Sequence, residues 1–263
     1  MGCSASKDLS LLERLRDSFP KTLAILELQQ YSVILANAFL EADQSGNLTL
    51  NLREFLVLCN IPRNRVSERL FAIVDMDGTG TLDFRECCYA LWQLCTLDYE
   101  GLQSFLFDLY DEFNNGTIEY DDIERMLKDG YGNHVSEEVD EVVQYVKDKG
   151  VLTRLDFIRF CDRCPQALKQ LVDVQKSMRA QILGQQVWLN LERRRSKKTD
   201  PFYRPENWSL LMERIIMMDI EARDEIEHKR KEQEILYGKR VGRSSKIAPG
   251  MSGDDETRIR YEP

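Results

Sequence analysis

The chain has 263 residues, of which 43% are apolar and 31% are charged, and its formal net charge is −9. This composition excludes a wholly disordered chain and a collagen, and no run approaches the roughly 18 uninterrupted apolar residues of a membrane-spanning helix. The charge is uneven, because residues 1–165 carry 16 Lys/Arg against 29 Asp/Glu, whereas residues 166–198 carry 8 against 2. An acidic body argues against nucleic-acid binding and favours cations or basic partners.

The N-terminus carries the residues of a lipidation signal. Gly2 becomes the first residue once Met1 is removed, and Ser6 stands where the myristoylation pattern requires it. Cys3, next to the acylated glycine, is suited to palmitoylation, and a second chain makes an otherwise marginal anchor stable. We expect a lipid-anchored protein on the cytoplasmic side of a membrane, partly cytosolic. The alternative is an ordinary start that happens to contain Gly and Ser.

An apolar run over residues 8–27 follows and is broken by Pro20. We interpret residues 1–27 as an acylated segment with a leading helix that packs on the body. A helix that docks a partner is the alternative.

The body contains a repeat of about 35 residues. Glycines stand at 46, 80, 116 and 150, at spacings of 34, 36 and 34, and each is followed two residues later by an aliphatic residue. Apolar residues with helical spacing flank them, such as Val66, Leu70 and Val74 before the second glycine. The pattern predicts a helix–loop–helix unit that occurs four times.

The second repeat identifies the unit. Its loop, residues 75–86, reads Asp-Met-Asp-Gly-Thr-Gly-Thr-Leu-Asp-Phe-Arg-Glu and resembles the EF-hand calcium loop, which has oxygen ligands at positions 1, 3, 5, 7, 9 and 12. Calcium takes six to eight oxygen ligands, and Gly80 at position 6 permits the sharp turn that brings early and late ligands together. Leu82 at position 8 lies in the short strand that pairs with a neighbouring hand. The ligands implied are the carboxylates of Asp75, Asp77, Asp83 (through a water) and Glu86, the hydroxyl of Thr79 and the backbone carbonyl of Thr81.

The first loop fits less well in either of two registers. With Gly46 as the turn glycine, position 12 is Leu52, which offers no ligand atom. A loop that starts at Asp43 ends on Glu54 but places Leu48 at the turn position. We expect this loop to be empty.

The third and fourth loops are degenerate in different ways. In the third, Phe113 fills a ligand position, and Asp122 is one methylene shorter than the usual Glu, which makes bidentate closure harder. In the fourth, Lys147 and Lys149 stand at ligand positions, so we expect a structural hand that holds no dication. The residues of a weaker site for calcium or magnesium in the third loop are Asp111, Asn115, Thr117, Glu119 and Asp122.

The resemblance covers roughly residues 28–162 and is greatest to four-hand sensors of the calmodulin, calcineurin B and recoverin-like kind. It implies an all-α fold of two EF-hand pairs, residues 28–95 and 96–164, with short β-strands between the loops. A helical C-terminal extension follows. EF-hands pack in pairs, and therefore a hand that binds no ion still supports its partner.

The basic segment 165–198 is predicted to form one amphipathic helix that begins at Pro165. Its apolar stripe and Trp188 suit the groove of an open EF-hand, so the helix docks on its own chain, lies on an anionic membrane or binds another partner. Residues 199–237 are predicted as a linker with a charged helix. Residues 238–263, rich in Gly, Ser and charge, are predicted to be disordered.

No sequence pattern of a catalytic site stands out. The chain has two histidines and no phosphate-binding glycine loop, and Cys161-x-x-Cys164 lacks the second ligand pair of a zinc site. We expect a non-enzymatic, membrane-tethered calcium sensor or regulatory adaptor that presents an apolar groove to a helical protein target. It would take no nucleic acid and no small-molecule substrate. The alternative is a calcium-independent scaffold or regulatory subunit with one structural ion.

Overall fold

The computed structural model describes residues 11, 15, 18–111, 113, 115–131 and 137–244. It divides the chain into two units, Met1–Asp219 and Ile220–Pro263. In the described part the first unit is all-α with two small two-stranded sheets, which confirms the predicted class. None of the described helices is both long and apolar enough to cross a bilayer.

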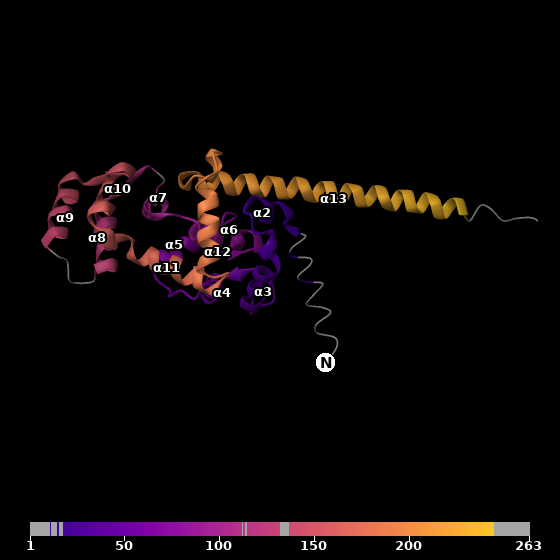
Figure 1. Cartoon of the computed structure of the whole chain (residues 1–263), viewed down its shortest axis with the longest axis horizontal. Coiled ribbons are helices and arrows are strands. Elements are labelled where there is room, and N and C mark those ends of the chain that lie inside the picture. The colour runs from indigo at the N-terminus through magenta and orange to yellow at the C-terminus, as the bar shows by residue number, and fades with distance from the viewer. Residues whose placement is uncertain are drawn as a thin grey trace, which may run out of the picture. The chain divides into compact units, whose positions relative to one another are not determined.

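The helices and strands follow the predicted repeat (Figure 1). The N-terminal part supplies α2 (Pro20–Ile25) and η1 (Gln29–Tyr31). The first pair of hands contains α3 (Ser32–Ala42), β1 (Leu50–Asn51), α4 (Leu52–Cys59), α5 (Arg65–Val74), β2 (Thr81–Leu82) and α6 (Phe84–Cys95). The second pair contains α7 (Tyr99–Tyr110), β3 (Thr117–Glu119), α8 (Tyr120–Tyr131), α9 (Glu137–Lys149), β4 (Val151–Thr153) and α10 (Arg154–Arg163).

Aliphatic residues in the loops hold each pair of hands together. In the first pair, Leu50 of β1 lies opposite Leu82 of β2, and in the second pair Ile118 of β3 lies opposite Leu152 of β4. All four side chains are at most 1% exposed. Each sheet therefore fixes one loop against its neighbour and anchors both to the core.

The C-terminal extension differs from the predicted single helix. Residues 165–198 form η2 (Pro165–Leu168), α11 (Lys169–Gln181) and α12 (Gln185–Arg195). The chain turns at Leu183 and Gly184, whose φ values are +64° and +83°, and glycine adopts this left-handed conformation readily. The prediction of one continuous helix is wrong at this turn.

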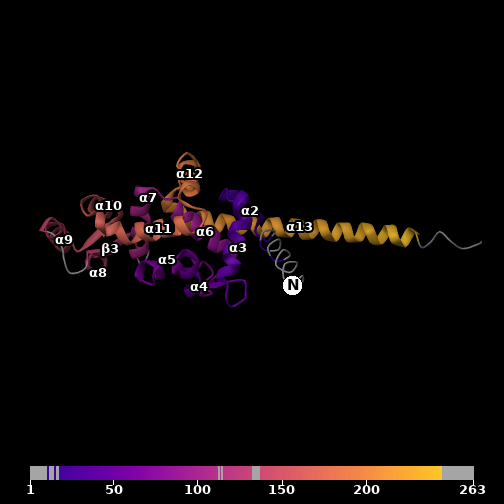
Figure 2. The same ribbon diagram turned by 60° about the horizontal axis from the view of Figure 1, so that its bottom comes forward.

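The extension packs on the hands of its own chain. Figure 1 and Figure 2 both show α11 beside α5 and α6, and α11 also contacts α4 and α7. Trp188 of α12 is fully buried, and its indole N–H donates to the carbonyl of Ile182 at 2.5 Å. Of the three predicted arrangements of the basic segment, the structure therefore has the one docked on its own chain.

The last helix is longer than predicted. After η3 (Pro201–Tyr203) and η4 (Pro205–Asn207), α13 runs over Trp208–Ser244. It therefore continues through residues 238–244, for which the sequence predicts disorder, because Lys239, Arg240 and Val241 add no helix breaker after Gly238. The remainder of the predicted tail lies outside the described residues. In the second unit, i,i+4 ion pairs support the helix: Glu227–Lys231 at 2.8 Å and Arg230–Glu234 at 3.2 Å.

Asp219 of α13 caps a helix that lies almost 200 residues earlier in the chain. Its carboxylate is fully buried and accepts from the backbone N–H groups of Lys21 (2.9 Å) and Thr22 (3.2 Å) and from the Thr22 hydroxyl. Phe19 is the N-cap residue of α2, and its phenyl ring cannot accept a hydrogen bond from these N–H groups. One carboxylate thus satisfies the first turn of α2 and ties it to α13.

We predict that Asp219→Ala lowers the free energy of unfolding by about 1–3 kcal/mol, because buried donors in α2 lose their acceptor. Asp224→Ala, an exposed change on the same helix, is the control and should stay within about 0.5 kcal/mol of wild type. Urea unfolding followed by circular dichroism measures both. Equal losses for the two variants would contradict the capping role.

Candidate metal centre

Three carboxylates converge in the loop between α5 and α6. Asp75, Asp77 and Glu86 each place one carboxylate oxygen within 4.8 Å of the others. Asp75 directly follows α5, whereas Glu86 lies in the first turn of α6, so the two helices bring the ends of the loop together. Among the residues that the structure describes, this is the one group of three His, Cys, Asp or Glu side chains arranged in this way.

The backbone of this second loop wraps around Asp75. One oxygen of its carboxylate accepts from Thr79 N–H at 3.0 Å, and the other accepts from Gly80 N–H at 2.8 Å. Gly80 has φ +76°, which a residue with a side chain adopts only at a cost. The turn predicted from the sequence therefore forms, and it points successive backbone groups towards the same centre.

Glu86 is the most strongly perturbed of the implied ligands. It is 1% exposed and accepts from Met76 N–H (3.2 Å) and Asp83 N–H (3.0 Å). Burial raises the pKa of Glu86 to about 7, and the negative charges of Asp83 and Asp77 act in the same direction. A cation that neutralised this cluster would relieve the repulsion, so the donor set fits a hard dication.

The remaining implied ligands of the second loop, Thr79, Thr81 and Asp83, make hydrogen bonds or ion pairs with other groups of the loop and of α6. The Thr79 hydroxyl donates to the Thr81 carbonyl at 3.0 Å, so these two oxygens are neighbours. Asp83 accepts from Glu86 N–H at 2.8 Å and pairs with Arg85 at 3.1 Å. Asp83 thus caps α6 and does not belong to the group of three converging carboxylates.

The first loop adopts the register that begins at Asp43, and the alternative register on Gly46 is wrong. Leu50, opposite Leu82, must share loop position 8 with it. Asp43 accepts from Leu48 N–H at 2.8 Å, as Asp75 does from Gly80 N–H. Leu48 has the left-handed φ of +63° that the turn needs, at a cost of roughly 1–2 kcal/mol for a residue with a side chain.

This register gives the first loop a set of oxygen donors, although the sequence led us to expect an empty loop. Glu54 is buried and accepts from Ser45 N–H (3.0 Å) and Asn51 N–H (2.9 Å), as Glu86 accepts from the backbone of the second loop. Glu54 at position 12 is the sequence signal that could have found the register, because position 8 is leucine in both registers and the alternative places Leu52 at position 12. Positions 1, 3, 5, 7, 9 and 12 are Asp43, Ser45, Asn47, Thr49, Asn51 and Glu54.

The turn of the third loop is formed, but the carboxylate at position 12 pairs with an arginine. Asp111 accepts from Asn115 N–H (3.0 Å) and Gly116 N–H (2.8 Å), as in the other loops. Asp122 at position 12 instead pairs with Arg125 at 2.8 Å and lies 3.6 Å from Arg65. The Thr117 hydroxyl donates to Asn115 at 2.7 Å, Glu119 is exposed, and Phe113 is 79% exposed.

In the fourth loop an ammonium group lies against the closing carboxylate. Lys149 Nζ is 2.5 Å from Asp156 Oδ2, and this hydrogen bond lowers the pKa of Asp156 to about 2. The turn at Gly150, with φ +79°, is retained. The hand therefore keeps its shape and its strand while an internal cation takes the carboxylate.

The other candidate positions lie apart from these loops. Gly2 and Cys3, the expected lipidation sites, are outside the described residues. Cys161 and Cys164 are buried, and burial raises the pKa of both thiols. Burial also raises the pKa of the Cys87 and Cys88 thiols on α6. Such thiols are poor nucleophiles and poor metal ligands at neutral pH.

The chain is similar in sequence to several known proteins. The chain is 32% identical over 143 residues to the type 2 calcineurin B protein of Rattus norvegicus, an alignment that covers 51% of this chain and 78% of that protein. The chain belongs to the EF-hand calcium-binding superfamily. This EF-hand chain is also 31% identical over 114 residues to calcineurin B of Schizosaccharomyces pombe, with 43% of this chain and 63% of that protein covered.

A further similarity involves a much longer protein. The EF-hand chain is 30% identical over 131 residues to human lysophosphatidylcholine acyltransferase 1, which covers 47% of this chain but 24% of that protein. No family model matches the chain. A solved redox protein from Chlamydomonas reinhardtii aligns with 23% identity and a TM-score of 0.22, over 53% of this chain and 50% of that one, which is too low to support an argument.

The raised pKa of Glu86 predicts how the metal-free protein responds to pH. An unfolded Glu titrates near 4.5 and folded Glu86 near 7, so between these values the folded state binds more protons than the unfolded state. The contribution of Glu86 to the free energy of unfolding therefore falls as pH rises from about 4.5 to about 7.

The variant Glu86→Gln cannot ionise, so it should gain stability relative to wild type when the pH is raised from about 4.5 to about 7.5 in EDTA. Urea unfolding at the two pH values measures this change, and any constant effect of the amide cancels in the comparison. A wild-type-minus-variant difference that is the same at both pH values would contradict the pKa assignment.

Proposed function

We propose that this chain is a calcium-binding regulatory protein whose principal ion site is the second loop. The observation that carries the proposal is the convergence of Asp75, Asp77 and Glu86 between α5 and α6. The ion would be held by these carboxylates, the Thr79 hydroxyl, the Thr81 carbonyl and, through water, Asp83. When bound, calcium would supply the positive charge that the cluster lacks.

Glu86 links this site to the rest of the fold. It lies in the first turn of α6, and in the absence of an ion its carboxylate accepts from Met76 N–H and Asp83 N–H. An ion that took both carboxylate oxygens would compete with these hydrogen bonds and so change how α6 begins. EF-hand sensors use such changes to alter an apolar surface.

A protein target is the partner that the relatives support. Those relatives are named as subunits of calcineurin, which indicates assembly with another polypeptide. The proposed role is therefore regulatory rather than catalytic. The second candidate is a calcium-independent scaffold with a structural ion. The packing of α11 against α4–α7 favours this candidate, because it covers the hands from within the chain. A target affinity that changes at micromolar calcium supports the sensor, and a constant affinity supports the scaffold.

Calcium titration by isothermal calorimetry tests the ion site. We expect a Kd within the sensor range of roughly 10⁻⁷–10⁻⁵ M at the second loop, and Glu86→Gln should weaken it at least about tenfold, because position 12 closes the site with both oxygens. Asp122→Asn is the matched control, since its carboxylate already pairs with arginine. A Glu86→Gln variant that kept the tight site would overturn the assignment.

The same titration examines the first loop in its Asp43 register. We expect a second, weaker ion that Glu54→Gln removes, because this loop offers two carboxylates where the second offers four. Magnesium or calcium at the third loop should be weaker still, because Arg125 competes for Asp122. One ion in wild type, unchanged in Glu54→Gln, would show that the first loop is empty.

We also propose that acylation of Gly2 and Cys3 tethers the protein to the cytoplasmic leaflet, with a partly cytosolic pool. Gly2→Ala removes the acyl acceptor and should release the protein to the soluble fraction. Cys3→Ser should leave a transient association, since a single myristoyl chain binds with K of only roughly 10⁴ M⁻¹. Membrane fractionation of cells measures both, and two variants as firmly bound as wild type would contradict the proposal.

A further inference from the structure

Two arginines of α5, in the second hand, reach the third hand. Arg65 Nη2 lies 3.6 Å from Oδ1 of Asp122, which closes the third loop at position 12, and the Arg65 guanidinium lies 5.6 Å from the ring centre of Tyr110. Arg69 donates from Nε to the carbonyl of Leu109 at 2.9 Å. Because residues four apart are neighbours on a helix, one face of α5 contacts both the segment that enters the third loop and the residue that closes it.

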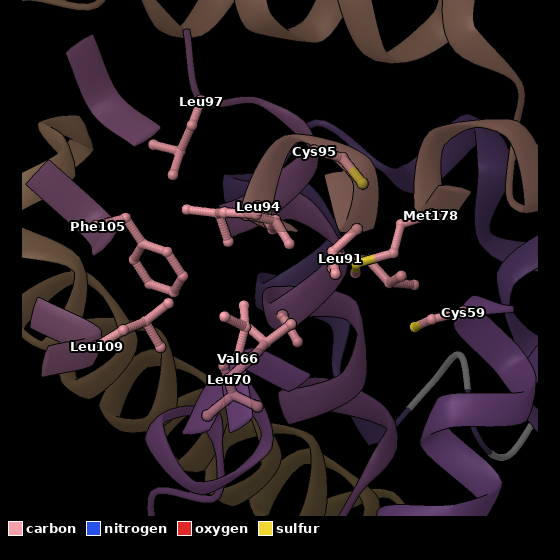
Figure 3. Packing of buried hydrophobic residues seen from close by; sticks show 14 of the residues in the cluster. Cys59, Val66, Leu70, Leu91, Leu94, Cys95, Leu97, Phe105, Leu109 and Met178 are labelled. Carbon is pink, nitrogen blue, oxygen red and sulfur yellow. The ribbon is translucent and has the colours of Figure 1, made fainter. Parts of the chain in front are cut away.

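Apolar packing fixes α5 in this position. Val66 and Leu70 of α5 are at most 3% exposed, and Figure 3 shows them beside Phe105 and Leu109 of α7. The two arginines are therefore carried by a helix that is already held against the third hand.

The same helix leads directly into the second loop. α5 ends at Val74, and the next residue, Asp75, is one of the three converging carboxylates. Arg65 is the first residue of this helix of 10 residues. One short helix thus joins the first ligand of the second loop to the closing residue of the third.

The closing carboxylate of the third loop has two positively charged neighbours. Arg125 lies 2.8 Å from the same oxygen of Asp122 as Arg65, and the three side chains are 52%, 14% and 29% exposed, in that order. In the fourth loop, Lys149 lies against Asp156 in the same way. In both loops of the second pair, a basic side chain therefore supplies positive charge at the carboxylate that would close around an ion.

The rest of the third loop fits a weak ion site. Its turn is formed, since Gly116 has φ +77° and its N–H donates to Asp111. Position 3 lacks a ligand, because Phe113 stands there. Further oxygen donors in the loop are Asn115, Thr117 and Glu119. The charge around Asp122 therefore decides how well the loop closes on a cation.

We propose that Arg65 sets the ion affinity of the third loop from the second hand. Its guanidinium is a resident cation at Asp122, and a calcium or magnesium ion that enters the third loop must displace it. The ion affinity of the third loop is therefore a property of both hands. The inference rests on the proposed function, since it describes the regulation of a further ion site in the same protein.

The size of the effect follows from the exposure of the ion pair. Fully exposed ion pairs change an equilibrium constant by up to about fivefold. The pair of Arg65 with Asp122 is partly shielded from solvent, so salt and water screen it less. Removal of Arg65 should therefore strengthen ion binding at the third loop by at least about threefold, and removal of both arginines by at least about tenfold.

Two-dimensional amide NMR of the full chain, titrated with calcium, reads the loops separately. Gly116 N–H donates to Asp111 and Gly80 N–H donates to Asp75, both at 2.8 Å. An ion bound by either aspartate polarises the amide that donates to it, so Gly116 reports the third loop and Gly80 the second. The calcium concentration at the Gly116 midpoint should fall at least about threefold in Arg65→Gln and at least about tenfold in Arg65→Gln/Arg125→Gln.

Matched variants separate the Arg65 contact from a general change of charge. Arg63→Gln removes the same charge two residues earlier, where Arg63 pairs with Glu68 and is 71% exposed, and should shift the Gly116 midpoint less than about twofold. Arg65→Lys keeps the charge and should also stay within about twofold of wild type. Asp122→Asn, added to Arg65→Gln/Arg125→Gln, should abolish the gain. The amide spectrum checks the fold of each variant, and Arg65→Met replaces Arg65→Gln if the latter is unfolded.

A measurement without metal tests the same contact. In EDTA, Arg65→Gln should lower the urea midpoint of unfolding in a chain that has Asp122. The same change should lower it less in an Asp122→Asn chain, because the ion pair is then already lost.

Three results would overturn the inference: a Gly116 midpoint that both arginine variants leave unchanged, an equal shift in Arg63→Gln, or a gain that survives Asp122→Asn. The Gly80 amide separates this outcome from that of the proposed function. A chain in which Gly116 responds as expected while Gly80 does not respond to calcium keeps the role of Arg65 and loses the principal site. A chain in which Gly80 responds and Gly116 ignores the arginines does the reverse.

Discussion

The structure depends on which groups donate hydrogen bonds to the backbone carbonyls at the C-terminal end of α6. Arg195 of α12 is 6% exposed, donates to the Gln93 carbonyl (3.2 Å), the Gln93 side chain (2.9 Å) and the Thr96 hydroxyl (2.9 Å), and stacks on Trp92 at 4.2 Å. Together with Arg179 of α11, which donates to the carbonyl of the last α6 residue at 2.9 Å, it concentrates positive charge at the negative pole of α6. Burying a guanidinium is costly unless its hydrogen bonds are made, and here they are made to a helix end.

This arrangement places ion site and extension on one element. The first turn of α6 contains Glu86 and its last turn receives the donors of α11 and α12. An α-helix is stiff over this length, so a change of tilt at one end moves the other. A change of tilt at Glu86 would therefore also shift the end of α6 that receives the donors of α11 and α12, as the proposed regulatory function requires.

Much of this can be predicted from the sequence, and the failures have physical causes. The second loop is predictable in full because its ligand spacing and turn glycines agree. The first loop misleads because a glycine at position 4 resembles the turn glycine, while Leu48 accepts the strained conformation at position 6. The loop aliphatics do not resolve this in the sequence, because Leu48 and Leu50 both suit position 8 and only the pairing of Leu50 with Leu82 decides between them.

Long-range polar contacts cannot be predicted in the same way. The sequence marks Arg195 as one of several cations at a helix end, and only the position of Trp92 and Gln93 decides that it is buried while Arg193 is exposed. The Asp219 cap on α2 likewise joins residues nearly 200 positions apart. Periodicity reports which face of a helix is apolar, but not which buried polar group will meet another.

The reactivity of the two thiols that follow Glu86 depends on whether α6 stays packed. Cys87 and Cys88 are at most 2% exposed and their pKa values are raised by burial, so an alkylating reagent meets neither a thiolate nor an open path. An opening of α6 that uncovered them would expose them next to Glu86. When α6 closes again faster than the reagent reacts, the labelling rate resolved at these two cysteines would report the opening equilibrium of α6 in the untagged protein.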